Sequence, residues 1–335
     1  MTPFVRLMQF AGACLAISAN AADNLPSLKG DPGSTTVSGL SSGAVMASQY
    51  DVAFSASVRG VGIVAGVAYY CAGGDILKVG ICMGNVPAMP PNAALLAAAA
   101  QSFAAAGKID SVDHLRTHRV YVFSGTNDQV VKPPAVEAVV SFYKLMGVDA
   151  SALEYVNTVP SGHALITPSY GNDCAQNAAP FISHCTVNGT PYDQAGAILN
   201  HMYGHLNAPV DDLSGKMLTF NQREFAAKNT AMADDAFVYV PKACAEGAIC
   251  RLHIAFHGCT QSAKAVGDKF YANGGYNRWA DSNRIIVLYP QVNASLLNPQ
   301  GCWDWWGFTG SEYATKAGPQ MAAVKSMADR ILGIN

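Results

Sequence analysis

Residues 37–46 are the part of the chain best suited to nucleophilic chemistry. They join a short β-like run to a Gly-x-Ser-x-Gly motif, Gly39 to Gly43, and then to a helix-like run of small and apolar residues. A sharp strand-to-helix turn needs small flanking residues so that a strained serine can project its hydroxyl. Ser41 is therefore the candidate nucleophile, and the amide of Ser42 could donate to an oxyanion. Gly/Ser-rich loops match this motif by chance, so it needs partners elsewhere in the chain.

Two further residues can complete a catalytic triad. A serine nucleophile requires a base, and the base requires an orienting carboxylate; in the α/β-hydrolase plan they follow in the order Ser, Asp, His. Asp128 follows the apolar strand expected at 118–123, and His163 follows the next expected strand, 153–157. We predict a triad of Ser41, Asp128 and His163. The alternatives are that Asp128 only caps its turn and that His163 is a surface histidine.

The sequence His257-Gly258-Cys259 follows the apolar strand 251–256. A His-Gly loop after an early strand usually supplies the second oxyanion amide, here that of Cys259. In this chain the loop comes after the triad, so we predict a circular permutation that moves the nucleophile turn near the amino terminus. Such a permutation is tolerable because the termini of compact domains are often close together. We expect His257 to be structural rather than a second base.

Three of the four tryptophans fall within residues 303–306, in the order Trp-Asp-Trp-Trp. A core aromatic patch accounts for at least one ring. Three rings in four residues cannot all point one way, so we expect at least one of them near a cleft or exposed. Beside an oxyanion loop, such a ring suits an apolar, polymeric or aryl substrate.

The elements that must position these residues alternate between β-rich and helical patterns, which predicts an α/β fold with a mostly parallel central sheet flanked by helices. No repeat, low-complexity stretch or linker interrupts them, so we expect one catalytic domain over 23–335, without a separate substrate-binding domain. The expected strands are 60–66, 118–123, 153–157, 217–220, 236–241, 251–256 and 284–290, and the expected helices are 94–106, 134–146 and 320–331.

Residues 1–22 have the pattern of a secretory signal peptide. They carry one charge, Arg6, a short apolar core over 10–17, and an A-x-A cleavage site at 19–21. The core is too short to span a bilayer. Cys14 suggests a lipoprotein site only faintly, because the leucine usual three residues earlier is missing. We expect secretion, either extracellular or periplasmic.

Cleavage of that segment would remove Cys14 and leave eight of the nine cysteines. An even number in an exported protein indicates disulfides, although roughly a hundred connectivities are possible. Three pairs of neighbours would close short loops, and two cysteines are then left for each other. The pairs favoured by proximity are Cys71 with Cys82, Cys174 with Cys185, Cys244 with Cys250, and Cys259 with Cys302.

Composition excludes several partners. The formal net charge is −2 and only 13% of residues are charged, which gives no footprint for nucleic acid or an anionic membrane. We expect an uncharged substrate and a monomer.

His201 and His205 lie four apart in a helical pattern and could bind a metal. No carboxylate stands near them in the sequence and the chain has no C-x-x-C, so we expect no metal and no cofactor.

Together these residues make the chain resemble the circularly permuted single-domain polyhydroxybutyrate (PHB) depolymerases of the esterase/PHB-depolymerase group of α/β hydrolases. The resemblance spans nearly the whole mature chain. The segments that carry it are residues 37–43, 124–128, His163, 257–262, 275–281, 288–291 and 301–305.

This resemblance implies hydrolysis of poly(3-hydroxybutyrate) or a related aliphatic polyester to oligomers and monomer through an acyl-enzyme. It implies the same triad, the oxyanion amides of Ser42 and Cys259, the four local disulfides, and a substrate-lining role for Trp305. Related enzymes cleave feruloyl or acetyl esters of plant polysaccharides, so a carbohydrate or aryl esterase and a synthetic-polyester hydrolase are alternatives. A catalytically inactive hydrolase fold that only binds surfaces is the alternative outside the enzymes.

Overall fold

The computed structural model describes residues 23–334. The signal peptide expected at 1–22, with Cys14, lies outside these residues. Within them, none of the helices combines the length and apolar character needed to cross a membrane.

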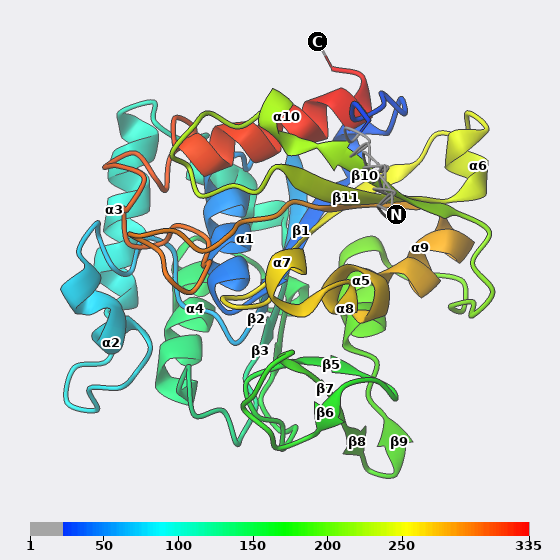
Figure 1. The fold of residues 1–335 in the computed structure, drawn as a ribbon. Helices are drawn as coiled ribbons and strands as arrows, with labels where there is room; N and C mark the ends of the chain where they lie inside the picture. Colours follow the sequence, from blue (N-terminus) through cyan, green and yellow to red (C-terminus); the bar gives the residue numbers. More distant parts are fainter. Residues whose placement is uncertain (1–22, 335) are drawn as a thin grey trace, which may run out of the picture.

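A central sheet of eight strands organises the molecule, in the order β10-β11-β13-β12-β1-β2-β3-β4 (Figure 1). All its neighbours pair in parallel except at β11, which is antiparallel to β10 and to β13. The strands are β1 (Thr35–Leu40), β2 (Val58–Val64), β3 (Arg119–Phe123), β4 (Leu153–Val156), β10 (Lys216–Asn221), β11 (Asp235–Val240), β12 (Arg251–Phe256) and β13 (Ile285–Tyr289).

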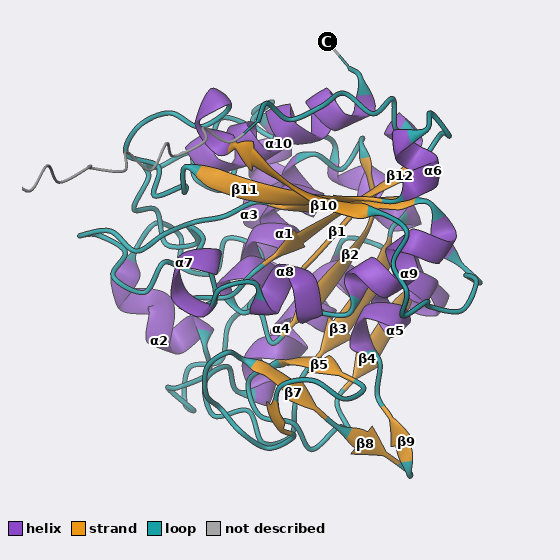
Figure 2. Ribbon diagram, turned by 45° about the vertical axis from the view of Figure 1, so that its right-hand side comes forward, coloured by secondary structure: helices purple, strands orange, loops and turns teal. Residues whose placement is uncertain are grey.

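Helices cover both faces of this sheet (Figure 2). Buried side chains of α1, α4 and α10 belong to one hydrophobic cluster, and those of α5, α8 and α9 to a second. The helices are α1 (Ser42–Ala53), α2 (Val79–Cys82), α3 (Ala93–Ala105), α4 (Pro133–Leu145), α5 (Gln194–Tyr203), α6 (Lys242–Ala245), α7 (Ala263–Val266), α8 (Lys269–Asn273), α9 (Tyr276–Asn283) and α10 (Pro319–Leu332).

The strands contribute alternate residues to the two clusters. In β3, Val120 and Val122 join the first cluster, whereas Tyr121 and Phe123 join the second. Successive side chains of a strand point to opposite faces, so a continuous apolar run is what a sheet buried on both faces requires. This explains why the strands were recognisable from short apolar runs in the sequence.

The α/β fold with a mostly parallel sheet and flanking helices is confirmed. Each expected strand and helix is present, with ends shifted by no more than two residues. Two small sheets were not predicted: β5 (Leu165–Thr167), β6 (Asn172–Asp173) and β7 (Ile182–His184) form one, and β8 (Thr186–Val187) and β9 (Thr190–Pro191) the other. Strands of two or three residues are too short for their alternation to show in a sequence.

The expectation that His201 and His205 share a helix is wrong. Helix α5 ends at Tyr203, because Gly204 adopts a φ of 82° and terminates it. A carboxylate does lie beside His201, but it comes from a distant part of the sequence. It belongs to Glu154 of β4, whose Oε2 lies 3.1 Å from Nδ1 of His201. Among residues 23–334, no three His, Cys, Asp or Glu side chains are grouped to hold a metal ion.

Four disulfides stabilise the loops around the sheet. They join Cys71 to Cys82, Cys174 to Cys185, Cys244 to Cys250, and Cys259 to Cys302. These are the pairs that proximity in the sequence favoured. The first three enclose short segments, whereas the fourth links loops 43 residues apart.

Candidate active site

Ser41 occupies the tight turn between β1 and α1. Its φ of 57° and ψ of −123° are unusual for a residue with a side chain. A Cβ at Gly39 would overlap the carbonyl oxygen of Gly43, and one at Gly43 would overlap the carbonyl oxygens of Phe256 and His257. Glycine is therefore required at both positions to let the turn close and to let α1 approach the end of β12.

Asp128 and His163 lie together beyond the ends of β3 and β4. The Nδ1 of His163 donates to Oδ2 of Asp128 at 2.8 Å, and both side chains are buried. The other carboxylate oxygen accepts from the amides of Val130, at 2.8 Å, and Val131, at 2.9 Å. Asp128 thus caps its turn and also binds the imidazole of His163, so the turn-capping alternative weighed from the sequence and the position required of an orienting carboxylate are both found in one residue.

Asn177 connects the loop of Asp128 to the loop of His163. Its Oδ1 accepts hydrogen bonds from the amides of Gln129 and His163, both at 2.9 Å. Its amide nitrogen donates to the carbonyl oxygen of Asn127 at 3.1 Å. Nothing in the sequence around Asn177 marked it, because its contacts join segments about 50 residues apart.

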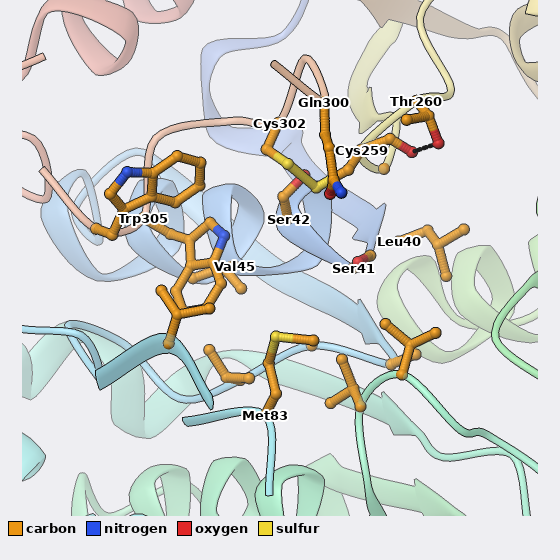
Figure 3. A pocket seen from close by; sticks show the side chains of 18 of the residues that line it. Leu40, Ser41, Ser42, Val45, Met83, Cys259, Thr260, Gln300, Cys302 and Trp305 are labelled. Carbon is orange, nitrogen blue, oxygen red and sulfur yellow. Dashed lines mark hydrogen bonds between the residues drawn. A yellow bond between two sulfur atoms is a disulfide. The ribbon is translucent and has the colours of Figure 1, made fainter. Parts of the chain in front are cut away.

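The two candidate oxyanion donors flank the serine. Ser42 begins α1, and Cys259 follows β12, the strand that pairs with β1. Within residues 23–334, neither amide donates a hydrogen bond to another protein group. The disulfide from Cys259 to Cys302 lies beside Ser41 and Ser42 in Figure 3, and the amide of Trp303 donates to the Ser42 hydroxyl at 3.3 Å.

One pocket of about 460 Å³ brings these groups together. We call it the Ser41 pocket. Its wall is mainly apolar, and both Ser41 and His163 reach it. Figure 3 shows Trp305 and Met83 across the pocket from Leu40. The lining includes Leu40, Ser41, Ser42, Val45, Ile76, Val79, Met83, Val130, Val131, His163, Phe181, Gly258, Cys259, Thr260, Leu297, Gln300, Cys302, Trp305 and Trp306.

The three clustered tryptophans have different surroundings. Trp303 is completely buried against Phe256, with ring centroids 5.1 Å apart. Trp305 and Trp306 both line the Ser41 pocket, and their rings meet edge to face. Trp303 therefore belongs to the core alone, whereas Trp305, which is also buried in the core cluster, and Trp306 contribute to the wall of the pocket.

A buried carboxylate holds this tryptophan loop in shape. The oxygens of Asp304 accept from the backbone amides of Trp306, Gly307, Phe308 and Thr309, and from the Thr309 hydroxyl. Burial raises the pKa of Asp304, and the surrounding donors oppose that rise. A buried acidic residue therefore shapes the loop whose Trp305 and Trp306 form one wall of the Ser41 pocket.

Among known proteins, the chain is 44% identical over 331 residues to a poly(3-hydroxybutyrate) depolymerase of Delftia acidovorans. The alignment covers 96% of this chain and 65% of the Delftia protein, so the chain spans less than two thirds of that relative's length. It is also 37% identical over 330 residues to a polyhydroxybutyrate depolymerase of Talaromyces funiculosus, with 93% of each chain covered. No family model matches the chain.

Solved structures show the same fold. The chain superimposes on the PHB depolymerase of Penicillium funiculosum with a TM-score of 0.85 and 34% identity, covering 92% of this chain and 99% of that one. A PHB depolymerase with one serine replaced by alanine, complexed with an R3HB trimer, gives the same values. With a relative 37% identical over nearly its full length, and with this agreement in fold, the chain belongs to the polyhydroxybutyrate depolymerase family.

Proposed function

We propose that this protein is a serine ester hydrolase that cleaves poly(3-hydroxybutyrate) to oligomers and monomer. The observation that carries the proposal is that Ser41 and His163, which is bound to Asp128, line one apolar pocket together with Ser42 and Cys259, whose amides donate to no other group among residues 23–334. The names of the relatives support the substrate, and one structural neighbour was solved with an R3HB trimer.

In the proposed reaction, the Ser41 hydroxyl attacks the ester carbonyl. Nδ1 of His163 is bound to Asp128, so Nε2 is the nitrogen that takes the serine proton. Negative charge develops on the carbonyl oxygen, where the Ser42 and Cys259 amides would stabilise it. Collapse of the intermediate releases the alcohol end of the polymer, protonated by His163, and leaves an acyl group on Ser41. Water, activated by the same imidazole, then releases the acid.

The mouth of the Ser41 pocket suits an insoluble apolar substrate. Ile76 and Leu297 line the pocket and are exposed, and their neighbours Leu77 and Leu296 are 85% and 96% exposed. Exposed apolar side chains gathered around a cleft are unusual on a protein that meets only water. They favour a polyester over the feruloyl or acetyl esters of hydrated polysaccharides.

We also propose that residues 23–335 act as one exported, monomeric domain. The four disulfides suit an oxidising compartment and agree with a signal peptide at 1–22. All the proposed catalytic groups come from one chain. Size-exclusion chromatography with light scattering and amino-terminal sequencing of the exported protein would test both points.

A circular permutation also has structural support. Strands β10 to β13 fill one side of the sheet and β1 to β4 the other. Compared with the usual α/β-hydrolase plan, the half of the sheet that carries the nucleophile therefore comes first in the chain instead of second. The amides of Leu28 and Gly30 donate to the carbonyl oxygen of Ile331, which places the two ends of the domain side by side. A chain joined there and opened between β4 and β10 would have the nucleophile near the middle of the sequence, after β10 to β13 instead of before them.

The decisive experiment compares wild type with Ser41→Ala on suspended poly(3-hydroxybutyrate), feruloylated xylan and acetylated xylan. We expect monomer and oligomer release from the polyester alone, complete loss in Ser41→Ala, and an unchanged melting temperature. Labelling of Ser41 by a fluorophosphonate would separate an enzyme from an inactive surface-binding fold. Faster release from either xylan, or an active Ser41→Ala enzyme, would overturn the proposal.

A further inference from the structure

His257 makes two hydrogen bonds with its buried ring. Its Nδ1 lies 2.7 Å from the carbonyl oxygen of Gly258, and its Nε2 lies 3.1 Å from the amide nitrogen of Val292. A backbone amide can only donate, so Nε2 must be the unprotonated nitrogen. Nδ1 therefore carries the hydrogen and donates it to the Gly258 carbonyl.

This bond determines where the neighbouring amide points. The Gly258 carbonyl and the Cys259 N–H belong to one peptide plane, which is trans. In a trans peptide the two groups point in opposite directions. Because the carbonyl points at the His257 ring, the Cys259 N–H points away from the ring. Both Gly258 and Cys259 line the Ser41 pocket.

The rest of the loop is held by other groups. The Gly258 amide donates to Oε1 of Gln261 at 2.7 Å, and Nε2 of Gln261 donates to the carbonyl oxygens of Pro180 and Phe181. The Cys259 side chain is fixed by its disulfide. These contacts fix the loop, but among the residues that the structure describes only His257 makes a hydrogen bond to the peptide that carries the candidate oxyanion donor.

The ring is suited to this task because it stays neutral. It is fully buried, and desolvation lowers the pKa of His257 to about 4, although its bond to the Gly258 carbonyl opposes the shift. A protonated ring would present a hydrogen to the Val292 amide and break that bond. A neutral ring donates on one side and accepts on the other.

We propose that His257 is a positioning residue for ester hydrolysis, which aims the Cys259 amide at the oxyanion by holding the carbonyl of the same peptide. The inference rests on the oxyanion hole proposed above. It gives His257 a role in the reaction without contact with the substrate.

Two substitutions separate the two hydrogen bonds of the ring, because each can keep one bond and loses the other. In His257→Asn the side-chain nitrogen can take the place of Nδ1 and still donate to Gly258, but nothing reaches Val292. In His257→Gln the side-chain oxygen can take the place of Nε2 and accept from Val292, but the bond to the Gly258 carbonyl is lost. If the ring only supports the core, through Val292, Gln should be the better replacement. If it positions the oxyanion donor, Asn should be.

The measurement is kcat and KM on p-nitrophenyl butyrate, corrected for the folded fraction by circular dichroism. We expect His257→Gln to lower kcat on the order of ten- to hundredfold with little change in KM, since loss of one oxyanion donor costs about a hundredfold or more. His257→Asn should retain most of the kcat. Equal kcat values for the two variants, or a higher value for His257→Gln, would overturn the inference.

Wild-type measurements test the inference independently of whether the variants fold. Heteronuclear NMR of the imidazole nitrogens should find the His257 hydrogen on Nδ1, and finding it on Nε2 would refute the proposed bond. In a phosphonate adduct of Ser41, the phosphonyl oxygen should lie within hydrogen-bond distance of the Ser42 and Cys259 nitrogens. An oxygen directed elsewhere would refute the oxyanion hole itself, whereas a correct adduct with a fully active His257→Gln enzyme would refute only the role of His257.

Discussion

Nδ1 of His163 donates to one carboxylate oxygen of Asp128 at 2.8 Å, and the second oxygen of that carboxylate is bound to the amides of its own loop. The carboxylate therefore cannot rotate without losing contacts on both sides. This arrangement fixes the imidazole with Nε2 free and makes a turn-capping aspartate into the orienting group of the proposed triad.

The first prediction concerns this carboxylate. Asp128→Asn can keep the loop hydrogen bonds through its oxygen, but its amino group then faces Nδ1 of His163 and favours the wrong tautomer. We expect kcat on p-nitrophenyl butyrate to fall on the order of a thousandfold or more, with a small change in melting temperature. Asp149→Asn is the matched control, because Asp149 caps an exposed turn through the Ser151 amide and binds no histidine among residues 23–334. Comparable activity in the two variants would contradict the assignment.

The second prediction concerns Asn177, whose side chain joins the loops of the acid and the base. Asn177→Ala removes the acceptor for the Gln129 and His163 amides. A displacement of about 1 Å at a catalytic group can cost on the order of a hundredfold, so we expect kcat to fall about ten- to hundredfold. Asn172→Ala is the control, because within the described part of the chain the side chain of Asn172 binds only the carbonyl oxygens of Ala178 and Ala179 in the same region. A kcat for Asn177→Ala equal to the control's would show that the loops hold their positions without this side chain.

Much of the fold could be predicted from the sequence because its signals are local. Strand β3 is a short apolar run that ends in a turn, and the turn at Ser41 needs glycines that are adjacent in the chain. Asp128 and His163 could be placed because parallel strands bring their carboxyl ends to one edge of a sheet.

The parts that could not be predicted depend on contacts between distant segments. Asn177 and Gln261 act through backbone groups of other loops, and no spacing in the sequence marks such contacts. Glu154 meets His201 only because β4 and α5 pack together. Trp303 has different surroundings from Trp305 and Trp306 because the chain turns at Asp304, whose carboxylate accepts hydrogen bonds from the amides that follow it.

The third prediction compares two disulfides. Removal of Cys259–Cys302 by a double serine substitution should lower both the melting temperature and kcat, because this bond supports the Cys259 loop beside Ser41. Removal of Cys244–Cys250 should lower only the melting temperature, because neither of these residues lines the Ser41 pocket. Each loss is worth on the order of 2–4 kcal/mol of unfolding free energy. The same kcat in both double variants would contradict a role of the first bond in catalysis.

The fourth prediction is a pH dependence of stability from His118. Its Nδ1 lies 2.7 Å from Asp51 and its Nε2 lies 3.0 Å from the carbonyl oxygen of Ser55. Burial alone lowers the pKa of His118, but the charge and hydrogen bond of Asp51 together with the Ser55 carbonyl outweigh it, so the pKa is raised. The folded protein therefore binds this proton more tightly than the unfolded chain does.

The sign of the effect follows from that difference. The stabilisation is fully present below the unfolded pKa of about 6.5 and is lost as the pH rises through the higher pKa of the folded state. Urea unfolding of the wild type should show a decrease in free energy across this range. His118→Gln should be less stable at low pH and should lack that decrease, whereas exposed His184→Gln should retain it. An equal slope in wild type and His118→Gln would refute the ion pair.

The last prediction separates polymer contact from core support within the tryptophan cluster. Trp305 lines the Ser41 pocket, and a flat amphipathic ring suits a chain of methyl-branched esters. Binding energy at remote subsites helps a long substrate reach the transition state, but a short ester occupies only the subsites next to Ser41. Trp305→Ala should therefore depress hydrolysis of poly(3-hydroxybutyrate) and its oligomers much more than that of p-nitrophenyl butyrate. Trp303→Ala is the matched control: this ring is completely buried, so its loss should lower stability and reduce both activities together. Trp305 also packs in the core cluster, so equal losses on the two substrates in Trp305→Ala would mean that this ring acts through core support alone, and the polymer would have to be bound by other residues of the pocket.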